Sequence, residues 1–193
     1  MKTTNLVRAA WPVVLALVWT AAKAADRAPA AVDDWRAKLA AELPRLGHRN
    51  WIVVADSAYP LQAAPGVETI YTPADQLDVL RGVLAELAKA RHVAPAILLD
   101  AELKYVPEAK APGVDAYRAG LERLLAGKKV ERVPHEQIIA RLDEAGRTFR
   151  VLLIKTPLAI PYTTVFIPLE CGYWDAAAEA ELRRAMQAAE ANK

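Results

Sequence analysis

The stretch that decides the fold spans residues 46–60 and reads LGHRNWIVVADSAYP. Its centre, Trp51 to Ala55, is continuously apolar and rich in β-formers, which is typical of a strand buried on both faces. His48 stands before this strand, and the carboxylate of Asp56 stands directly after it. Because ligands of open α/β sheets bind at the carboxyl ends of strands, Asp56 is a candidate ligand-binding residue. A turn leading into Ser57 to Pro60 explains an aspartate there equally well.

Predicted helices and strands alternate on both sides of this strand. The clearest helix covers residues 75–90, where Leu77, Leu80, Leu84 and Leu87 recur at spacings of three and four. Helices are also expected at 35–46, 114–125, 134–146 and 175–189, and strands at 67–71, 97–99, 129–133, 149–154 and 163–167. The alternation predicts the α/β class, with one domain of three α/β/α layers and a mostly parallel central sheet. The final helix is expected to cover the sheet or a neighbouring subunit.

The first 24 residues read as a cleavable signal peptide. Lys2 and Arg8 form a basic start, an apolar run follows, and Ala22-Lys23-Ala24 has the small residues of a cleavage site. An uncleaved membrane anchor is the competing interpretation, but Pro12 interrupts the run, which is shorter than the roughly 20 apolar residues of a spanning helix. We therefore expect a signal peptide at 1–24, a linker at 25–32 and a domain at 33–193. The protein is expected to be periplasmic or secreted, with no membrane attachment after cleavage.

Charge and cysteine content exclude several classes of partner and stabiliser. Subtracting the three basic residues of the leader from the 25 Lys and Arg of the whole chain leaves 22 basic against 23 acidic side chains. A nearly neutral chain without clustered Lys and Arg gives no support for binding nucleic acid or anionic membranes. Cys171 is the only cysteine, so no disulfide forms within the chain and the fold depends on its apolar core.

Three histidines are the main candidates for proton transfer, because histidine titrates nearest to neutral pH. His48 follows a helix end, where an imidazole also interacts favourably with the terminal carbonyls, and His92 is most simply explained in that way. His135 follows Pro134 in the first turn of a helix, where the dipole favours the neutral imidazole and so a proton acceptor. An ordinary solvent-exposed residue of the first turn is the alternative for His135.

Other chemistries find little support in the sequence. Ser57 is the only serine and lacks the Gly-x-Ser-x-Gly flanks of a nucleophile elbow, so a serine hydrolase is not expected. His135-Glu136-Gln137 has no second histidine at helical spacing, and one cysteine with three scattered histidines makes a poor zinc site. A glycine-rich phosphate loop is also missing. We therefore expect neither a metal nor a cofactor.

Three segments, in the same order along the chain, carry a family resemblance. They are Leu46-Gly47-His48 through Asp56 to Pro60, then His135-Glu136-Gln137, then Pro161-Tyr162-Thr163-Thr164. Together they resemble the D-ribose pyranase and L-fucose mutarotase (RbsD/FucU) family, over roughly residues 34–167. The resemblance implies an RbsD-like fold, a ring-shaped homo-oligomer with sites between subunits, and interconversion of the ring forms of free sugars without a cofactor. It also implies that His48 is the general acid, that His135 is a second imidazole of the pocket, and that Asp56, Tyr162 and Thr164 bind the sugar.

The sequence also departs from the family's pattern. Lys155-Thr156-Pro157-Leu158 replaces the family's Arg-Thr-Gly-Glu, and Thr164 offers one hydroxyl in place of an asparagine amide. A pocket with fewer hydrogen-bonding groups is expected to recognise different hydroxyls or to bind sugar more weakly. A fully extended backbone from His48 to Asp56 would span about 26 Å at about 3.3 Å per residue. Either the flanking loops fold back, or the two groups belong to pockets completed by different subunits.

We therefore expect an exported monosaccharide isomerase of the mutarotase or pyranase type, with His48 as the principal catalytic acid/base and His135 as an assisting catalytic residue. Asp56, Tyr162 and Thr164 are the expected sugar-binding residues. The alternative is a non-catalytic exported protein that holds a sugar or another small polar ligand on the same scaffold. A structural protein with a filled cleft is a third interpretation, which Leu158 or Tyr162 inside the pocket would favour.

Overall fold

The computed structural model describes residues 34–191, and the expected signal peptide and linker, residues 1–32, lie outside them. The described chain has α-helices, two 3₁₀ helices (η) and β-strands. In chain order they are α1 (Trp35–Glu42), η1 (Leu43–Arg45), β1 (Trp51–Ala55), β2 (Val67–Tyr71), α2 (Gln76–Leu87), β3 (Val93–Pro95), β4 (Ile97–Asp100), η2 (Ala101–Tyr105), α3 (Val114–Leu125), β5 (Val130–Val133), α4 (His135–Thr148), β6 (Val151–Lys155), β7 (Val165–Cys171) and α5 (Ala176–Ala191).

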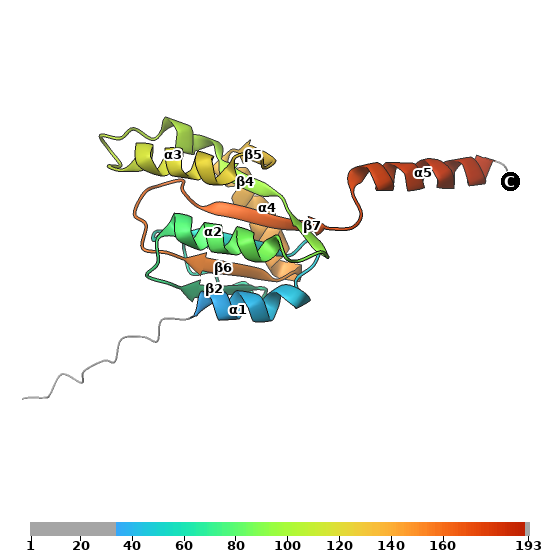
Figure 1. The fold of residues 1–193 in the computed structure, drawn as a ribbon, viewed down its shortest axis with the longest axis horizontal. Helices are drawn as coiled ribbons and strands as arrows, with labels where there is room; N and C mark the ends of the chain where they lie inside the picture. The colour runs from blue at the N-terminus through green and yellow to red at the C-terminus, as the bar shows by residue number, and fades with distance from the viewer. Residues whose placement is uncertain (1–33, 192–193) are drawn as a thin grey trace, which may run out of the picture. The chain divides into compact units, whose positions relative to one another are not determined.

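One sheet organises the domain, and β1 lies near its middle. Figure 1 labels β2, β6, β7, β4 and β5 across this sheet. The strand order is β2-β6-β1-β7-β4-β5, and β3 pairs with β7. β1 and β2 both run parallel to β6, and β4 runs parallel to β5. β7 is antiparallel to β1, β3 and β4, so it is the one reversed strand of the described sheet. The expected mostly parallel sheet is confirmed.

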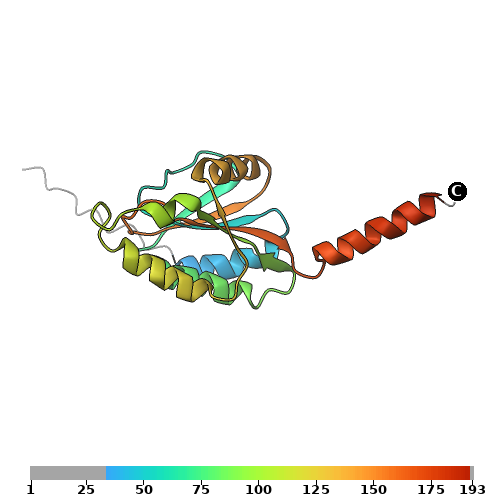
Figure 2. The same cartoon turned by 90° about the horizontal axis from the view of Figure 1, so that it is seen from above.

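Helices cover both faces of this sheet. Figure 2 shows α4 on one side and α1, α2 and α3 on the other. Side chains of β1 alternate between two separate cores, as successive residues of a strand must. Ile52 and Val54 join the core beneath α1 to α3, whereas Val53 joins the core beneath α4, with Phe166. The three α/β/α layers expected from the sequence are confirmed.

Three differences from the expected elements have physical reasons. β3 and η2 were not expected, because segments of three to five residues show too little periodicity to be recognised. β7 continues past Ile167 through Pro168, where the missing N–H is tolerated because pairing changes there from β4 to β3. α5 has no buried residue, so it adds nothing to the core of its own chain. That this helix covers a neighbouring subunit stays a prediction.

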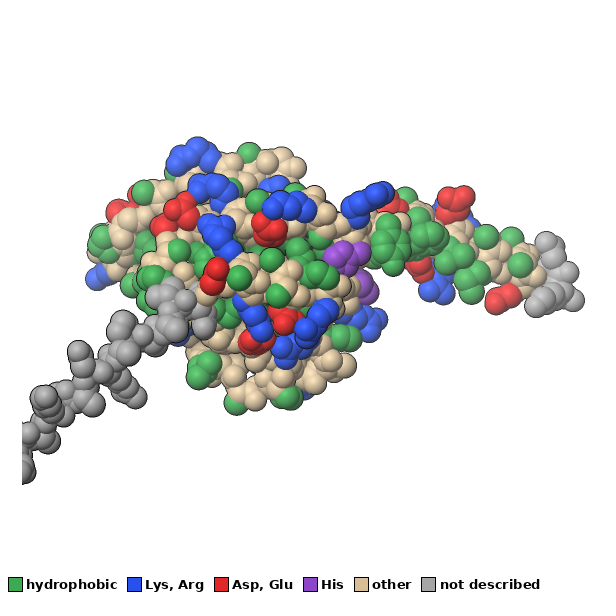
Figure 3. Space-filling model, turned by 60° about the horizontal axis from the view of Figure 1, so that its bottom comes forward, with side chains coloured by type: hydrophobic (Ala, Val, Ile, Leu, Met, Phe, Trp, Pro, Cys, Tyr) green, Lys and Arg blue, Asp and Glu red, His purple; other side chains and the backbone are tan. Residues whose placement is uncertain are grey.

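The described surface carries mixed charge. On the face shown in Figure 3, basic and acidic side chains are interspersed and do not gather into one basic area. None of the helices within residues 34–191 is both long and apolar enough to cross a membrane.

Candidate functional site

Several polar residues meet at one edge of the sheet because of strand direction. β1 and β4 run the same way, since both are antiparallel to β7. Their carboxyl ends therefore lie at the same edge, and β7 begins at that edge. Asp56 follows β1, Asp100 ends β4, His135 follows β5, and Thr164 immediately precedes β7. Residues far apart in the sequence thus come together where α/β proteins commonly bind ligands.

Asp56 and Thr164 form a buried pair. The Thr164 hydroxyl donates to Asp56 Oδ2 over 2.8 Å, and Thr164 Oγ1 accepts from the backbone N–H of Asp56 over 3.4 Å. The other carboxylate oxygen, Oδ1, accepts the backbone N–H of Ala58 over 2.8 Å. Asp56 therefore has the turn role that the sequence allowed, and Thr164 fixes its carboxylate. The two residues thus lie in contact where β1 ends and β7 begins.

His135 lies at the start of α4 between an acid and an aromatic ring. Its Nδ1 is 3.1 Å from Oδ2 of Asp100, and its ring meets the Tyr162 ring edge to face at a centroid distance of 5.6 Å. Both carboxylate oxygens of Glu102 accept the backbone N–H of His135 over 3.1 Å, which caps the first turn of α4. The His135 side chain is 31% exposed, and Nε2 makes no hydrogen bond within the described residues.

Tyr162 stands in a strained backbone conformation. Its φ is +60°, in the left-handed region that costs a non-glycine residue about 1 kcal/mol or more. Such outliers persist only where neighbouring structure holds them, and they are concentrated at functional sites. The side chain is 39% exposed, so the strain presents an aromatic ring to solvent beside His135.

A buried polar network holds the loop that carries Tyr162 and Thr164. The Gln76 side-chain amide donates to the Tyr117 hydroxyl over 2.9 Å and to the backbone carbonyl of Thr163 over 2.6 Å. The Thr156 hydroxyl lies 2.9 Å from Gln76 Oε1, and the Tyr117 hydroxyl also donates to the Thr163 carbonyl. α2 and α3 thus anchor both ends of the loop over residues 157–162.

The divergent segment Lys155 to Leu158 is part of this scaffold. Lys155 Nζ donates to the backbone carbonyl of Tyr59 over 2.6 Å and so ties down the loop that follows Asp56. Leu158 packs against the core beneath α1 to α3. The segment therefore supports the loops on both sides of the site, and Leu158 belongs to that core.

A cleft of 360 Å³ opens beside His135. It is lined by the following residues: Glu102, Tyr105, Val106, Pro107, Lys110, Ala111, Pro161 and Tyr162. Its size falls in the range of small-ligand pockets, about 300–1,000 Å³. Tyr162 and Glu102 connect this cleft to His135, and Tyr105 offers a second exposed aromatic ring.

Burial sets the charge at this edge of the sheet. Desolvation is the main cause that raises the pKa of Asp100 from 3.8 to about 6, and His135 partly offsets it. Desolvation also raises the pKa of the Tyr59 and Tyr117 hydroxyls well above the ordinary tyrosine value, so both stay neutral. At neutral pH Asp100 is therefore a buried carboxylate whose nearest basic group is His135.

His48 lies apart from these residues. It precedes β1, whereas Asp56 follows it, so the two residues flank opposite ends of the strand. His48 lines a separate hollow of 470 Å³ with Arg49, Trp51, Arg141 and Glu170 among its neighbours. The structure thus brings together Asp56, His135, Tyr162 and Thr164 but not His48. Within one chain, the loops do not fold back to join the two ends of β1.

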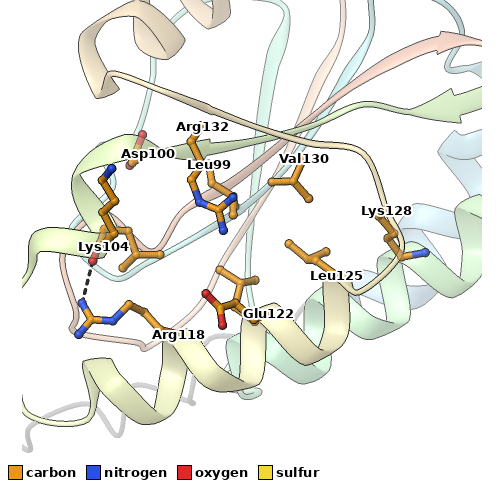
Figure 4. A pocket seen from close by; sticks show the side chains of 11 residues that line it. Leu99, Asp100, Lys104, Arg118, Glu122, Leu125, Lys128, Val130 and Arg132 are labelled. Atoms are coloured by element: carbon orange, nitrogen blue, oxygen red, sulfur yellow. Dashed lines mark hydrogen bonds between the residues drawn. The ribbon is translucent and has the colours of Figure 1, made fainter.

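A third hollow, of 330 Å³, lies between α3 and the β4–β5 edge (Figure 4). Its floor is apolar, with Leu99, Leu121 and Leu125, and its rim carries mainly Lys and Arg side chains. Asp100 borders it, but none of the five predicted site residues does. Within residues 34–191, no three His, Cys, Asp or Glu side chains cluster in a way that could hold a metal ion.

The sequence was compared with known families and proteins. The model of the RbsD / FucU transport protein family matches residues 36–168, which is more than half of the chain. The chain belongs to the RbsD/FucU family. The family resemblance seen in the sequence is thereby confirmed, and all five predicted site residues of this RbsD/FucU member fall inside the matched range. The comparison with curated proteins gave no match.

Three solved structures are similar to this RbsD/FucU member. Bacillus subtilis RbsD complexed with D-ribose is 22% identical, with a TM-score of 0.48, and the match covers 72% of this chain and 93% of that chain. FucU from Bifidobacterium longum is 13% identical, with a TM-score of 0.47 and coverage of 68% and 92%. The fucose mutarotase of Streptococcus pneumoniae in complex with L-fucose is 16% identical, with a TM-score of 0.45 and coverage of 68% and 89%. The family assignment rests on the family model.

Sequence reasoning missed Asp100 and the residues of the buried network. Asp100 had a usable signal, because it follows the apolar run Ile97 to Leu99 just as Asp56 follows β1. Gln76 had none. A glutamine in the first turn of a helix is usually exposed, and only the tertiary structure shows that it is 1% exposed.

Proposed function

We propose that this protein is a cofactor-independent monosaccharide isomerase of the mutarotase or pyranase type. The observation that supports this most is the continuous set of contacts that joins Asp56 to Thr164 and, through the same loop, Tyr162 to His135 and Asp100. It provides carboxylate and hydroxyl groups for sugar hydroxyls, an aromatic ring, and an imidazole for proton transfer. Membership of a family that includes ribose- and fucose-binding proteins agrees with this chemistry.

The reaction needs one proton acceptor and one proton donor. His135 Nε2 takes the proton of the anomeric hydroxyl, whose O–H electron pair forms the carbonyl bond. The ring C–O bond breaks, its electrons stay on the ring oxygen, and that oxygen takes a proton from the donor. The open-chain sugar rotates and closes by the reverse transfers, so no proton or electron is lost. Asp56, held by Thr164, and Tyr162 orient the sugar during these steps.

We propose His48 as the proton donor, supplied by a second copy of the chain. His48 and Asp56 flank opposite ends of β1 within one chain, so a neighbouring copy is the source that would bring an imidazole to this edge. In that arrangement each complete site uses two chains of a homo-oligomer. The proposal accounts for a histidine that lines a hollow of its own, away from the other four residues.

Saturation-transfer NMR on free D-ribose and L-fucose tests the activity. The protein should accelerate exchange between the ring forms of at least one of these sugars, and His135→Ala and His48→Ala should each remove most of the acceleration. Tyr162→Phe keeps the aromatic ring and removes the hydroxyl. Tyr71→Phe makes the same change on the exposed edge strand β2 and is its matched control. Binding of a sugar without faster exchange would favour the alternative of a non-catalytic binding protein.

Mixing two inactive variants tests the shared site. Co-expressed His48→Ala and His135→Ala chains form some mixed interfaces in which both histidines are intact, so a fraction of the activity should return. The double variant His48→Ala/His135→Ala, co-expressed with itself, is the control and should stay inactive. Mixed oligomers without any recovered exchange would place both histidines in the same chain or remove one of them from the reaction.

We also propose that the protein is exported through its N-terminal segment. The residues that support this, 1–24, lie outside the described structure, so the proposal rests on their sequence alone. Mass spectrometry of the protein recovered from the periplasm of a Gram-negative host should show cleavage after Ala24. An intact N-terminus in the cytoplasmic fraction would contradict export.

A further inference from the structure

Asp100 is a buried carboxylate that fold stability does not explain. It is 2% exposed, and neither of its oxygens has a hydrogen-bond partner among the described residues. Burying a carboxylate in this way destabilises a fold unless the charge is paired. Within residues 34–191, the one basic group within 4 Å of its carboxylate is His135, whose Nδ1 is 3.1 Å from Oδ2. The cost of burial therefore points to a role that involves this imidazole.

Asp100 has acidic neighbours on other elements, although it also borders the hollow whose rim carries Lys104, Arg118 and Arg132. Glu102 of η2 and Asp56 after β1 both disfavour its ionised form, and His135 of α4 is the group that favours it. The Tyr59 hydroxyl is neutral, because burial and the charges of Asp143 and Asp100 raise its pKa. Among the described residues, His135 is the basic group in contact with Asp100, and it favours the ionised carboxylate.

The geometry points to Asp100 as a positioning residue that keeps His135 in the Nδ1–H tautomer, with Nε2 free to accept a proton from the sugar. The Nδ1 to Oδ2 distance is that of a hydrogen bond, although the angle at the ring N–H is not. A carboxylate at Nδ1 fixes the tautomer of a catalytic histidine and stabilises the imidazolium formed during proton transfer. This inference rests on the proposed function, because it assumes that His135 is the base.

The first test reads the tautomer without any substrate. Nitrogen-15 NMR of the imidazole rings at pH 8 should show His135 protonated at Nδ1 in the parent protein. In Asp100→Asn the amide offers an N–H to Nδ1, so the tautomer should change to Nε2–H. Asp143→Asn, an exposed aspartate further along α4, is the matched control and should leave His135 unchanged. An Nε2–H tautomer in the parent, or no change in Asp100→Asn, overturns the inference.

The second test reads catalysis. At pH 8 Asp100→Asn should slow sugar exchange by about 100-fold, the scale of a general base, and Asp143→Asn should keep the parent rate. Adding Asp100→Asn to His135→Ala should change the rate less than twofold, because a residue that acts through His135 has nothing left to act on. A further large loss in the double variant would assign Asp100 a purely structural role and overturn the inference.

The two tests separate this inference from the proposed function. If the parent protein accelerates no sugar exchange, the isomerase assignment fails, while the NMR spectra still decide whether Asp100 sets the His135 tautomer. If exchange is catalysed and the tautomer does not depend on Asp100, the isomerase assignment stands and the positioning role fails.

Discussion

Replacing Asp100 with asparagine should stabilise the protein at neutral pH while it impairs the reaction. The pKa of Asp100 is raised from 3.8 to about 6. Between these values the native state keeps a proton that the unfolded chain has released, so this group lowers the free energy of unfolding as the pH rises through that window. About two pH units at about 1.4 kcal/mol each give a loss of about 3 kcal/mol, complete above pH 7. Asparagine does not titrate in this range, so Asp100→Asn does not undergo this loss of stability.

Urea unfolding, followed by the fluorescence of the buried Trp35 and Trp51, measures this effect. The stability difference between Asp100→Asn and the parent should shift by about 2.5 kcal/mol in favour of the variant from pH 4 to pH 8, because the unfolded carboxyl is already partly ionised at pH 4. Comparing the two pH values cancels the effect of the side-chain replacement itself. The exposed control Asp143→Asn should show almost no shift. If the difference for Asp100→Asn is the same at both pH values, then burial does not destabilise the Asp100 charge and the reasoning fails.

Two further substitutions test the scaffold of the site, and a third tests packing at the opposite edge of the sheet, where β2 and β6 begin. Thr164→Val removes the hydroxyl bonded to Asp56 and should lower the free energy of unfolding by about 1–2 kcal/mol in urea, and an unchanged midpoint would show that this pair contributes little. Gln76→Leu removes the amide at the centre of the buried network, so it should lower the free energy of unfolding by about 2–3 kcal/mol and lower the thermal midpoint. A midpoint equal to that of the parent would contradict the role assigned to the network. Gly66→Ala places a Cβ 2.2 Å from the carbonyl oxygen of Phe149 and should cost about 3 kcal/mol or more, whereas the control Gly47→Ala meets nothing within 4 Å and should be tolerated.

Much of the fold was predictable because its signals are local. The apolar run Trp51 to Ala55 and the leucine stripe of α2 each specify an element and its buried side, and both appear as expected. The direction of β7 was not predictable, since an apolar strand has the same composition whichever way it runs. Pro168 also misled, because a proline normally ends a central strand and here it lies at a change of pairing partners.

The candidate site was predictable only in part. Motif matches indicated Asp56, His135, Tyr162 and Thr164, and the structure shows them at one edge. Chain geometry left two possibilities for His48 and Asp56, either loops that fold back or pockets completed by different subunits, and the structure places the two residues at opposite ends of β1. The contact between Asp100 and His135 depends on the pairing of β4 with β5. The order of strands in a sheet cannot be predicted from short sequence patterns, so this contact could not be predicted either.

The reversed direction of β7 has a consequence for how this scaffold can diversify. Because β7 begins at the edge where β1 and β4 end, the preceding segment, residues 157–162, lies across the candidate site. Thr156 and Thr163, on either side of this segment, are hydrogen-bonded to Gln76 of α2. In the proposed isomerase, mutations between these two anchor points can change the preferred sugar without altering the pairing of any strand. Natural variation in substrate choice should therefore accumulate at residues 157–162, and directed evolution toward a new sugar has a defined six-residue target there.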